Sequence, residues 1–152
     1  AIGPDYLKGH YAAWNYFQTV ESAANKKFVE AFKKKYGEDR VTNDPMEAAY
    51  IAVYLWKQAV EKAGTADDLA KVRTAAYGQT LDAPEGKVTL NKNHHISKVV
   101  RIGEVRDDGL FEIVYSTDKA VAPLPWNQFV KETKGYSCDW SDPNKGGKYK
   151  SA

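Results

Sequence analysis

One short segment combines a turn, a carboxylate and a long apolar run. Asp44-Pro45-Met46-Glu47 is followed by nine residues without a charge, Ala48–Trp56. Asp44 suits the N-cap of a helix, Pro45 its first position and Glu47 its third, which is a variant of the capping box. A carboxylate at this place can also accept N–H bonds from a small ligand. Helix capping and ligand binding are therefore both open interpretations of Glu47.

Aromatic side chains gather in two places and offer a second kind of chemistry. One group lies along Gly9–Phe17, and the other lies in the apolar run after Glu47. Tyrosine and tryptophan combine an apolar ring with a polar group, which suits small polar ligands and plain cores alike. Core packing is the default interpretation for each ring, and ligand contact is the alternative.

The other reactive residues form no catalytic pattern. His94-His95 places two imidazoles together, but neighbours on an extended segment point to opposite faces, and helical metal sites use a spacing of four. Cys138 has no base near it in the sequence, and "DPNKGGKYK" lacks the strand and helix that flank a phosphate loop. The sequence therefore predicts a protein without catalytic residues, metal or cofactor, in which the two histidines lie in a loop or pack.

Composition predicts an ordinary globular domain. Of the 152 residues, 43% are hydrophobic and 28% are charged, and 22 basic residues nearly balance 20 acidic ones, for a net charge of +2. The longest basic run, Lys33–Lys35, falls on a predicted helix, so nucleic-acid binding is not expected. The lone cysteine cannot form an internal disulfide. No apolar run reaches the roughly 18 residues of a membrane span.

The first third of the chain predicts a strand and a helix. Gly9–Phe17 is short and aromatic, which is typical of a buried strand. In "NKKFVEAFKKKYG" three aromatic rings recur every four residues, which predicts one apolar face of a helix that Gly37 ends. Those rings are Phe28, Phe32 and Tyr36.

Two further helices are predicted after this one. The first should run from Asp44 to about Ala63 and stop at Gly64. Because it is apolar on every side up to Trp56, it should be covered on most of its circumference. In the second, Thr65 is expected to be the cap with Asp68 at the third position, and Gly78 to be the stop. The residues expected to face inward are Leu69, Val72 and Ala76.

Strand signals dominate the chain after Gly78. Gly86–Leu90 is a short strand candidate, and Lys98–Ser116 predicts two strands around Asp108-Gly109, a strong hairpin signal. The stretch from Val121 should be mostly irregular and tied down by four aromatic rings. These rings are Trp126, Phe129, Tyr136 and Trp140. One strand, three helices and a hairpin make an α/β or α+β unit with too few strands for its helices, which indicates missing sequence.

Several stretches together resemble a known family. "DPMEAAYIAVYLW", "NHHISKVVRIGEVRDDGLFEIV", the widely shared "FVEAFKKKYG" and the end "WNQFVKETKGYSCDW" are similar to the C-terminal part of the solute-binding protein of urea and short-chain amide ATP-binding-cassette transporters, in a cyanobacterial-like form. The wider group is the type I periplasmic binding fold. The resemblance covers nearly the whole chain and implies an α/β fold of Rossmann-like, three-layer αβα type with two lobes.

The resemblance implies how the chain is divided. Residues 1–120 would supply a hinge strand, three helices and the hairpin, mostly of the first lobe, and 121–152 would wrap the second lobe as an irregular tail. The chain would be a fragment of a longer receptor, periplasmic or extracytoplasmic, with a lipid anchor on its missing N-terminal part. Its partners would be a urea or amide ligand, that missing part and the membrane permease. An amide-sensing regulatory or interaction protein of the same fold is the alternative.

The resemblance also selects the expected site. In related receptors the helix that begins with "DPMEAAY" points its N-terminus at the cleft between the lobes, with free N–H groups and a positive dipole end. Met46, Glu47 and Tyr50 are therefore the expected ligand-binding residues of that helix. Trp14 and Asn15 are expected to join them from the hinge strand. No residue is expected to be catalytic.

Overall fold

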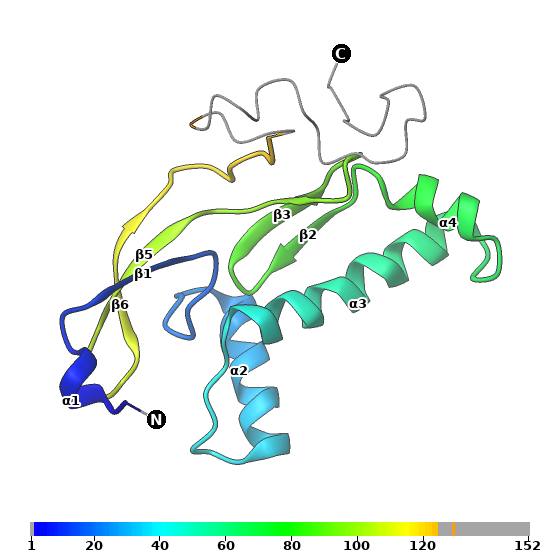
Figure 1. The fold of residues 1–152 in the computed structure, drawn as a ribbon. Helices are drawn as coiled ribbons and strands as arrows, with labels where there is room; N and C mark the ends of the chain where they lie inside the picture. The colour runs from blue at the N-terminus through cyan, green and yellow to red at the C-terminus, as the bar shows by residue number, and fades with distance from the viewer. Residues whose placement is uncertain (1, 125–128, 130–152) are drawn as a thin grey trace.

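The computed structural model describes residues 2–124 and 129. Its helices and strands form two groups, each of which packs mainly within itself (Figure 1). One group is a three-stranded sheet, and the other combines three helices with a second three-stranded sheet. The α/β class expected from the sequence is thereby confirmed, and all strand pairs described are antiparallel.

The first sheet has the order β1-β5-β6, with α1 (Pro4–Leu7) before it. The predicted hairpin is confirmed, because β5 and β6 pair on either side of Asp108-Gly109. The predicted strand Gly9–Phe17 is shortened and mostly exposed, since among the described residues β1 is an edge strand that pairs with β5 alone. The bounds of the three strands are Tyr11–Trp14 for β1, Arg101–Val105 for β5 and Phe111–Ser116 for β6.

The helices lie where the sequence predicts them, but their caps differ. In α2 (Ala23–Tyr36) Ser22 is the N-cap, and Gly37 follows its end. In α3 (Asp44–Ala63) the N-cap is Asn43, whose side chain accepts a hydrogen bond from the Met46 N–H, so Asp44 is the first helical residue and not the cap. The carboxylate of Asp44 instead accepts a bond from the Tyr16 N–H at 2.9 Å.

The last helix, α4 (Leu69–Ala76), also begins later than predicted. Asp68 is its N-cap and accepts a hydrogen bond from the Lys71 N–H, whereas Thr65 caps the turn before it. Val72 is buried as expected, but Leu69 is among the most exposed apolar residues described. Leu69 is the first residue of the helix and lines an open hollow between α3 and α4.

The second sheet has the order β2-β3-β4, and two of its strands were not predicted. The strand expected at Gly86–Leu90 is β3, which is confirmed, and its partners are β2 (Thr80–Ala83) and β4 (Ile96–Ser97). The segment Thr80–Ala83 has few β-branched or aromatic residues, so it carries a weak strand signal. Pro84 and Glu85 form the tight turn between β2 and β3, and both are buried.

Two small cores hold the second group together. Tyr16 and Val20, from the chain that leaves β1, form the first with Phe28 of α2. The second joins Ile51 of α3 to Ala83 and Val88 of the β2–β3 hairpin. Val53, Tyr54 and Trp56 are exposed on the other side of α3, so the cover expected for this helix is absent from the described chain on that face.

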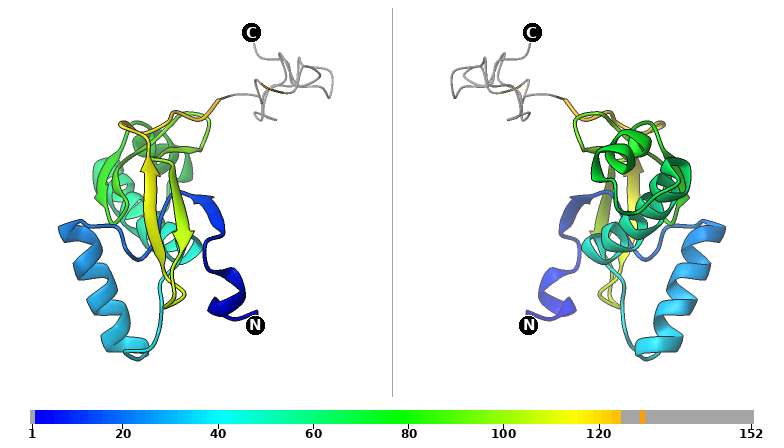
Figure 2. Two further views of the ribbon diagram at one scale, coloured as in Figure 1. Left: turned by 90° about the vertical axis from the view of Figure 1, so that its left-hand side faces the viewer. Right: turned by 90° about the vertical axis from the view of Figure 1, so that its right-hand side faces the viewer.

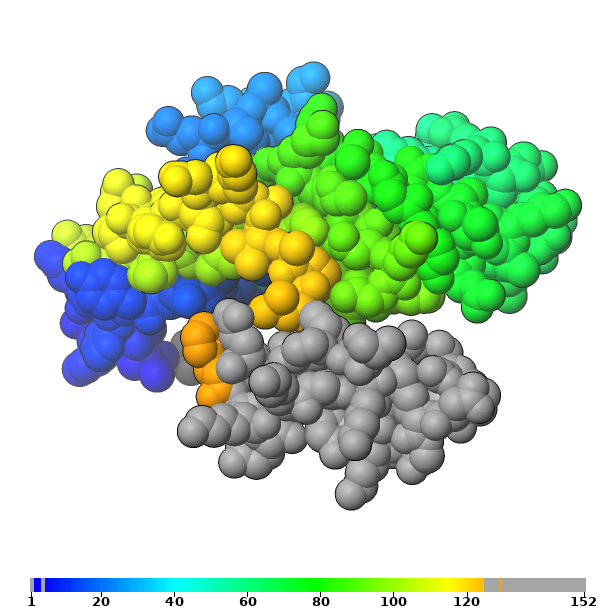
Figure 3. Space-filling model, turned by 90° about the horizontal axis from the view of Figure 1, so that it is seen from above, coloured from blue at the N-terminus to red at the C-terminus, as the bar shows by residue number. Residues whose placement is uncertain are grey.

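The whole described chain is elongated. Seen from above, β6 and α1 lie at one end and the part of the chain that holds α4 lies at the other (Figure 3). The side views place α1 and α2 on opposite sides of β5 and β6 (Figure 2). Among residues 2–124 and 129, no helix has the length and hydropathy of a membrane span. The predicted irregular tail and three of its four anchoring rings, Trp126, Tyr136 and Trp140, lie outside the described residues.

Candidate functional site

The chain passes twice between the two groups, and both passages lie at the same place. Residues 15–22 lead from β1 to α2, and residues 98–100 lead from β4 to β5. The two passages are bonded to each other, because Asn15 Nδ2 donates to the Val99 carbonyl at 2.9 Å. We call this region the junction. It is where a movement between the two groups would be concentrated.

The N-terminus of α3 lies against the junction, but it offers fewer donors than expected. Pro45 has no N–H, and the Met46 and Glu47 N–H groups are bonded to the side chain and the carbonyl of Asn43. Within the described chain, the N–H of Asp44 is left as the donor of the first turn. The Asp44 carboxylate stands beside it, so the positive dipole end is already faced by a negative charge.

A cavity of about 290 Å³ opens between β1, the start of α3 and the β5–β6 turn. Its walls are mostly apolar, and Trp14 is 43% exposed beside it. Its polar groups come chiefly from the segment Thr42–Asp44 and from Gln18. We call it the junction cavity. It combines an aromatic wall with a few hydrogen-bonding groups, which is the usual make-up of a small-molecule site.

A buried hydrogen-bond network supports one wall of this cavity. The Tyr16 hydroxyl donates to Asn25 Oδ1 at 2.8 Å and lies 2.7 Å from Thr42 Oγ1. Gln18 Oε1 accepts from the Thr42 N–H at 2.8 Å. Burial raises the pKa of Tyr16 to about 12, so its hydroxyl stays neutral and keeps its proton for this network. The network fixes the Thr42 side of the cavity before any ligand arrives.

Glu47 does not lie at the cavity. It is 0% exposed, and its carboxyl points inward to the β2–β3 turn, where Glu85 is 1% exposed. Lys98 Nζ, which is 12% exposed, lies 3.4 Å from Glu47 Oε2 and 2.8 Å from Glu85 Oε1. The capping-box interpretation of Glu47 is wrong, because its side chain pairs with Lys98 and not with the start of the helix.

Two carboxyls so close together cannot both ionise easily. Burial and the neighbouring Glu85 carboxyl raise the pKa of Glu47 to about 9, although Lys98 acts to lower it. Burial lowers the pKa of Lys98, but Glu85, Glu47 and Asp44 outweigh this effect, and the net direction is upward. Lys98 therefore stays a cation, and Glu47 holds its proton far more tightly than an exposed carboxyl does.

The structure brings together only part of the expected site. Trp14 lines the junction cavity, Asn15 bonds the two passages, and Met46 is half-buried on the first turn of α3. Tyr50 lies elsewhere, because it packs against Phe28 with ring centroids 4.6 Å apart. It lines a separate hollow of about 280 Å³ with Tyr54, Lys27 and Pro84.

Sequence reasoning missed three charged residues of the junction, namely Glu85, Lys98 and Arg101. The Arg101 guanidinium donates to the Asn15 carbonyl at 2.5 Å and to the Glu85 carbonyl at 2.6 Å. Lys98 lies 51 positions from Glu47 along the chain. The one available signal was the pair of basic residues, Lys98 and Arg101, that flank two valines at the start of a predicted strand.

The predicted loop at His94-His95 lies between β3 and β4. His94 has a positive φ of 66°, and its Nε2 lies 2.8 Å from the Tyr77 hydroxyl. Within the described residues no group of three or more His, Cys, Asp or Glu could hold a metal ion.

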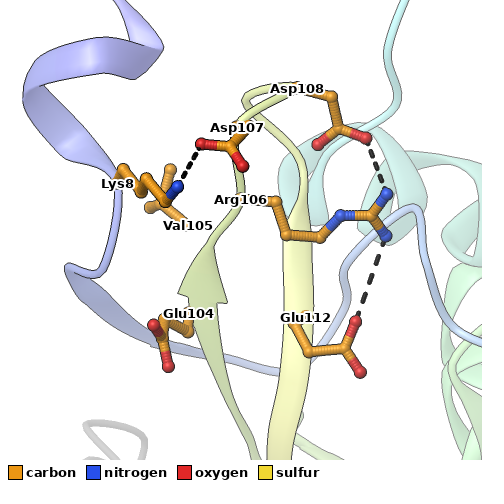
Figure 4. Close-up of a pocket in the computed structure, with 7 residues that line it drawn as sticks. All are labelled: Lys8, Glu104, Val105, Arg106, Asp107, Asp108 and Glu112. Carbon is orange, nitrogen blue, oxygen red and sulfur yellow. Dashed lines mark hydrogen bonds and ion pairs between the residues drawn. The ribbon is translucent and has the colours of Figure 1, made fainter.

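A charged hollow of about 430 Å³ at the tip of the β5–β6 hairpin is a weaker candidate for a ligand site (Figure 4). Five of its six charged side chains are exposed and already paired with one another, and the sixth, Glu104, is half-buried. Lys8 Nζ lies 2.6 Å from Asp107, and Arg106 lies 2.8 Å from Asp108 and 4.0 Å from Glu112. Such exposed pairs contribute about 0–1 kcal/mol each, and they occupy both of the cations that line the hollow, Lys8 and Arg106.

A fourth hollow is a mostly apolar groove of about 750 Å³ between α3 and α4. Its lining includes Leu55, Trp56, Leu69, Val72 and Ile96. We call it the α3–α4 groove. Arg73 and His94 are its polar lining residues and the rest of the lining is apolar, so it resembles a packing surface more than a site for a small polar ligand.

Comparison with known proteins decides the family. The sequence profile of the periplasmic binding protein domain matches residues 1–132. The chain belongs to the periplasmic binding protein family. A solute-binding protein of an ABC transporter from Rhodopseudomonas palustris BisB5, solved in complex with 3,4-dihydroxybenzoic acid, superposes on this periplasmic binding protein with a TM-score of 0.70 at 25% identity, over 78% of this chain and 33% of that one. The expected type I periplasmic binding fold is thus confirmed.

Two relatives of this periplasmic binding protein match over less of their own length. The Leu/Ile/Val-binding protein homolog 6 of Brucella abortus is 29% identical over 114 residues, which are 73% of this chain and 29% of that protein. A protein of Geobacillus stearothermophilus named limonene hydroxylase is 34% identical over 124 residues, which are 82% of this chain and 23% of that protein. The chain therefore spans about a quarter to a third of the proteins it matches.

Proposed function

We propose that this chain is part of an extracytoplasmic solute-binding receptor of an ABC uptake transporter. The observation that carries the proposal is the junction cavity, which lies between two separately packed groups in a chain of the periplasmic binding protein family. A cavity at such a place can close on a solute when the groups move toward each other. Trp14 and the start of α3 form the part of its wall that this chain supplies.

The charges around the cavity favour an uncharged ligand. Asp44 lines it, and three of the first four residues of α3 have no free N–H to offer an anion. A carboxylate ligand would meet the negative charge of Asp44, whereas an amide N–H can be bonded by it. Together with the resemblance of "DPMEAAYIAVYLW" to urea and amide receptors, this supports urea or a short-chain amide as the solute.

A small amide can bind only if nearly all its polar atoms are bonded. Urea has four heavy atoms, and a ceiling of about 1.5 kcal/mol per atom gives roughly 6 kcal/mol, or a dissociation constant of tens of micromolar. Binding at this level requires a dry site, which the closing of the cleft would supply. This chain alone supplies one wall, so the opposite wall has to come from other sequence.

The α3–α4 groove indicates where that other sequence packs. We propose that it is covered by the remaining part of the receptor, because the chain matches only 23–33% of the length of its relatives. Trp56 and Leu69 on this face are apolar and exposed, and a contiguous apolar surface of this kind is typical of an interface. The membrane permease would be a further partner of the assembled receptor.

Calorimetric titration of the protein produced from its complete gene tests the ligand. Urea and acetamide should bind, with L-leucine and 4-hydroxybenzoate as comparison ligands that should not. Trp14→Ala should weaken amide binding at least tenfold, whereas Tyr36→Ala, which removes an exposed ring at the end of α2, should leave it unchanged. Binding of 4-hydroxybenzoate but not of either amide would contradict the proposed ligand class. The intact mass of the native protein tests the missing partner sequence.

A further inference from the structure

The two groups are joined by a cluster of buried charges that lies outside the junction cavity. Glu47 belongs to α3, Glu85 to the β2–β3 turn, and Lys98 to the passage into β5. The Lys98 ammonium lies within 3.4 Å of both carboxyls. Two elements of the second group are therefore held to the residue from which the chain enters the first sheet.

Arg101 extends the same cluster to the other passage. Its guanidinium binds the carbonyl of Asn15 on one side and the carbonyl of Glu85 on the other. These bonds cross between the first sheet, the passage that follows β1 and the β2–β3 turn. Because Arg101 is 9% exposed, water cannot easily replace them. A swing of one group against the other would have to break or rearrange these contacts.

The hydrogen bonding of the carboxyls is incomplete without a proton. Within the described residues, Glu47 Oε1 and both Glu85 oxygens are buried and accept no hydrogen bond, although the Lys98 ammonium lies near Glu85 Oε1. A proton between the two carboxyls would satisfy one oxygen of each. The other charged or titratable groups that act on the pair are Lys98, Arg101, Tyr16 and, through Lys98, Asp44.

We propose that Glu47, Glu85 and Lys98 form a proton-dependent latch of the junction, which holds the two groups together while Glu47 keeps its proton. The use of this latch in solute capture rests on the proposed function, but the latch itself does not. Opening of the junction would expose the Glu47 carboxyl to water. Its pKa would then fall to the ordinary value of a glutamate, and its proton would be released. Opening therefore becomes easier as the pH rises, and closure is favoured in mildly acidic surroundings.

Hydrogen exchange of the ligand-free protein tests the latch. Amides of residues 15–20 and 98–101 report opening of the junction, and residues 54–60 of α3 report the stability of the second group. At each pH, the exchange rates of the wild type are divided by those of Glu47→Gln. This ratio cancels the ordinary pH dependence of amide exchange. With one proton released on opening, the wild-type opening constant should rise about tenfold per pH unit relative to the variant, or roughly 100-fold from pH 6 to pH 8.

Glu85→Gln provides a second variant in case Glu47→Gln does not fold, and it should likewise reduce the pH dependence. Glu112→Gln removes an exposed carboxylate of β6 and should behave as the wild type. If the opening constants of the wild type and both buried variants change in parallel with pH, the latch is overturned. It is also overturned if the extra opening of the wild type at high pH is equally large at residues 54–60, because the whole second group would then be unfolding. Because no ligand is present, failure of amide binding would refute the proposed function and leave this result standing.

Discussion

Replacing Glu47 with glutamine keeps the shape of the side chain and removes its ionisation. In the folded protein the pKa of Glu47 is raised from 4.5 to about 9, so the folded state binds this proton more tightly than the unfolded state does. The stabilisation that this proton gives is fully present below pH 4.5 and is lost as the pH rises toward about 9. Glutamine has no acidic proton, so the stability of the variant should not fall over this pH range for this reason.

The size of the effect follows from the one proton involved. Within that window the free energy of unfolding of the wild type should fall, relative to Glu47→Gln, by about 1.4 kcal/mol per pH unit. From pH 5.5 to pH 8.5 the difference accumulates to about 4 kcal/mol in favour of the variant. The slope depends on the proton count and not on the exact pKa, provided that the proton stays bound in the folded state.

Denaturation in guanidinium chloride at four pH values measures this difference. Urea is unsuitable as the denaturant, because it is a proposed ligand. Glu112→Gln should follow the wild type, since that carboxylate is exposed. If the free energies of the wild type and Glu47→Gln remain parallel from pH 5.5 to pH 8.5, Glu47 is ionised in the folded protein and the reasoning is wrong.

Three further substitutions test the packing and the caps. Lys98→Met leaves two buried carboxyls without their cation and should destabilise the protein by about 3–5 kcal/mol, and a loss below 1 kcal/mol in chemical denaturation would contradict the burial of the pair. Gly103→Ala would place a Cβ 2.9 Å from the Phe17 ring and 3.0 Å from Phe111, so a loss of about 1–3 kcal/mol is expected, and an unchanged melting temperature would show that these rings can move apart. Asn43→Ala removes the side-chain cap of α3 and should lower the free energy of unfolding by about 1 kcal/mol, measured in the same melts. Equal stability of the variant and the wild type would show that the Asn43 side chain does not cap the helix.

The helices and the long hairpin could be predicted because their signals are local. Phe28 and Phe32 recur at helical spacing, and Asp108-Gly109 marks a turn between two apolar strands. Helix caps were less certain, because Asn43 and Asp44 both suit the position and tertiary contact decides between them. The Asp44 carboxylate accepts a hydrogen bond from the Tyr16 N–H, so the side chain of Asn43 caps the helix instead.

The site was predicted only in part, because its geometry depends on distant residues. Trp14 and the start of α3 come together as expected. Nothing local in the sequence indicates that Glu47 turns inward, since its direction is set by Glu85 and Lys98, which follow it by 38 and 51 positions (85 − 47 and 98 − 47). The resemblance placed Tyr50 with Glu47 at the start of α3, but the Tyr50 ring packs against Phe28 of α2, which holds it away from the junction cavity.

The buried turn between β2 and β3 has a consequence for how this sequence can vary. Most hairpin turns are surface loops where insertions are tolerated. Pro84 and Glu85 instead lie inside the protein, with the carbonyl of Pro84 bonded to Ser22 and that of Glu85 to Arg101. Even one added residue would push these carbonyls out of register. Homologues should therefore keep the length of this turn constant. The exposed stretch at Glu38-Asp39 should instead tolerate insertions, including a tag or a fluorescent reporter.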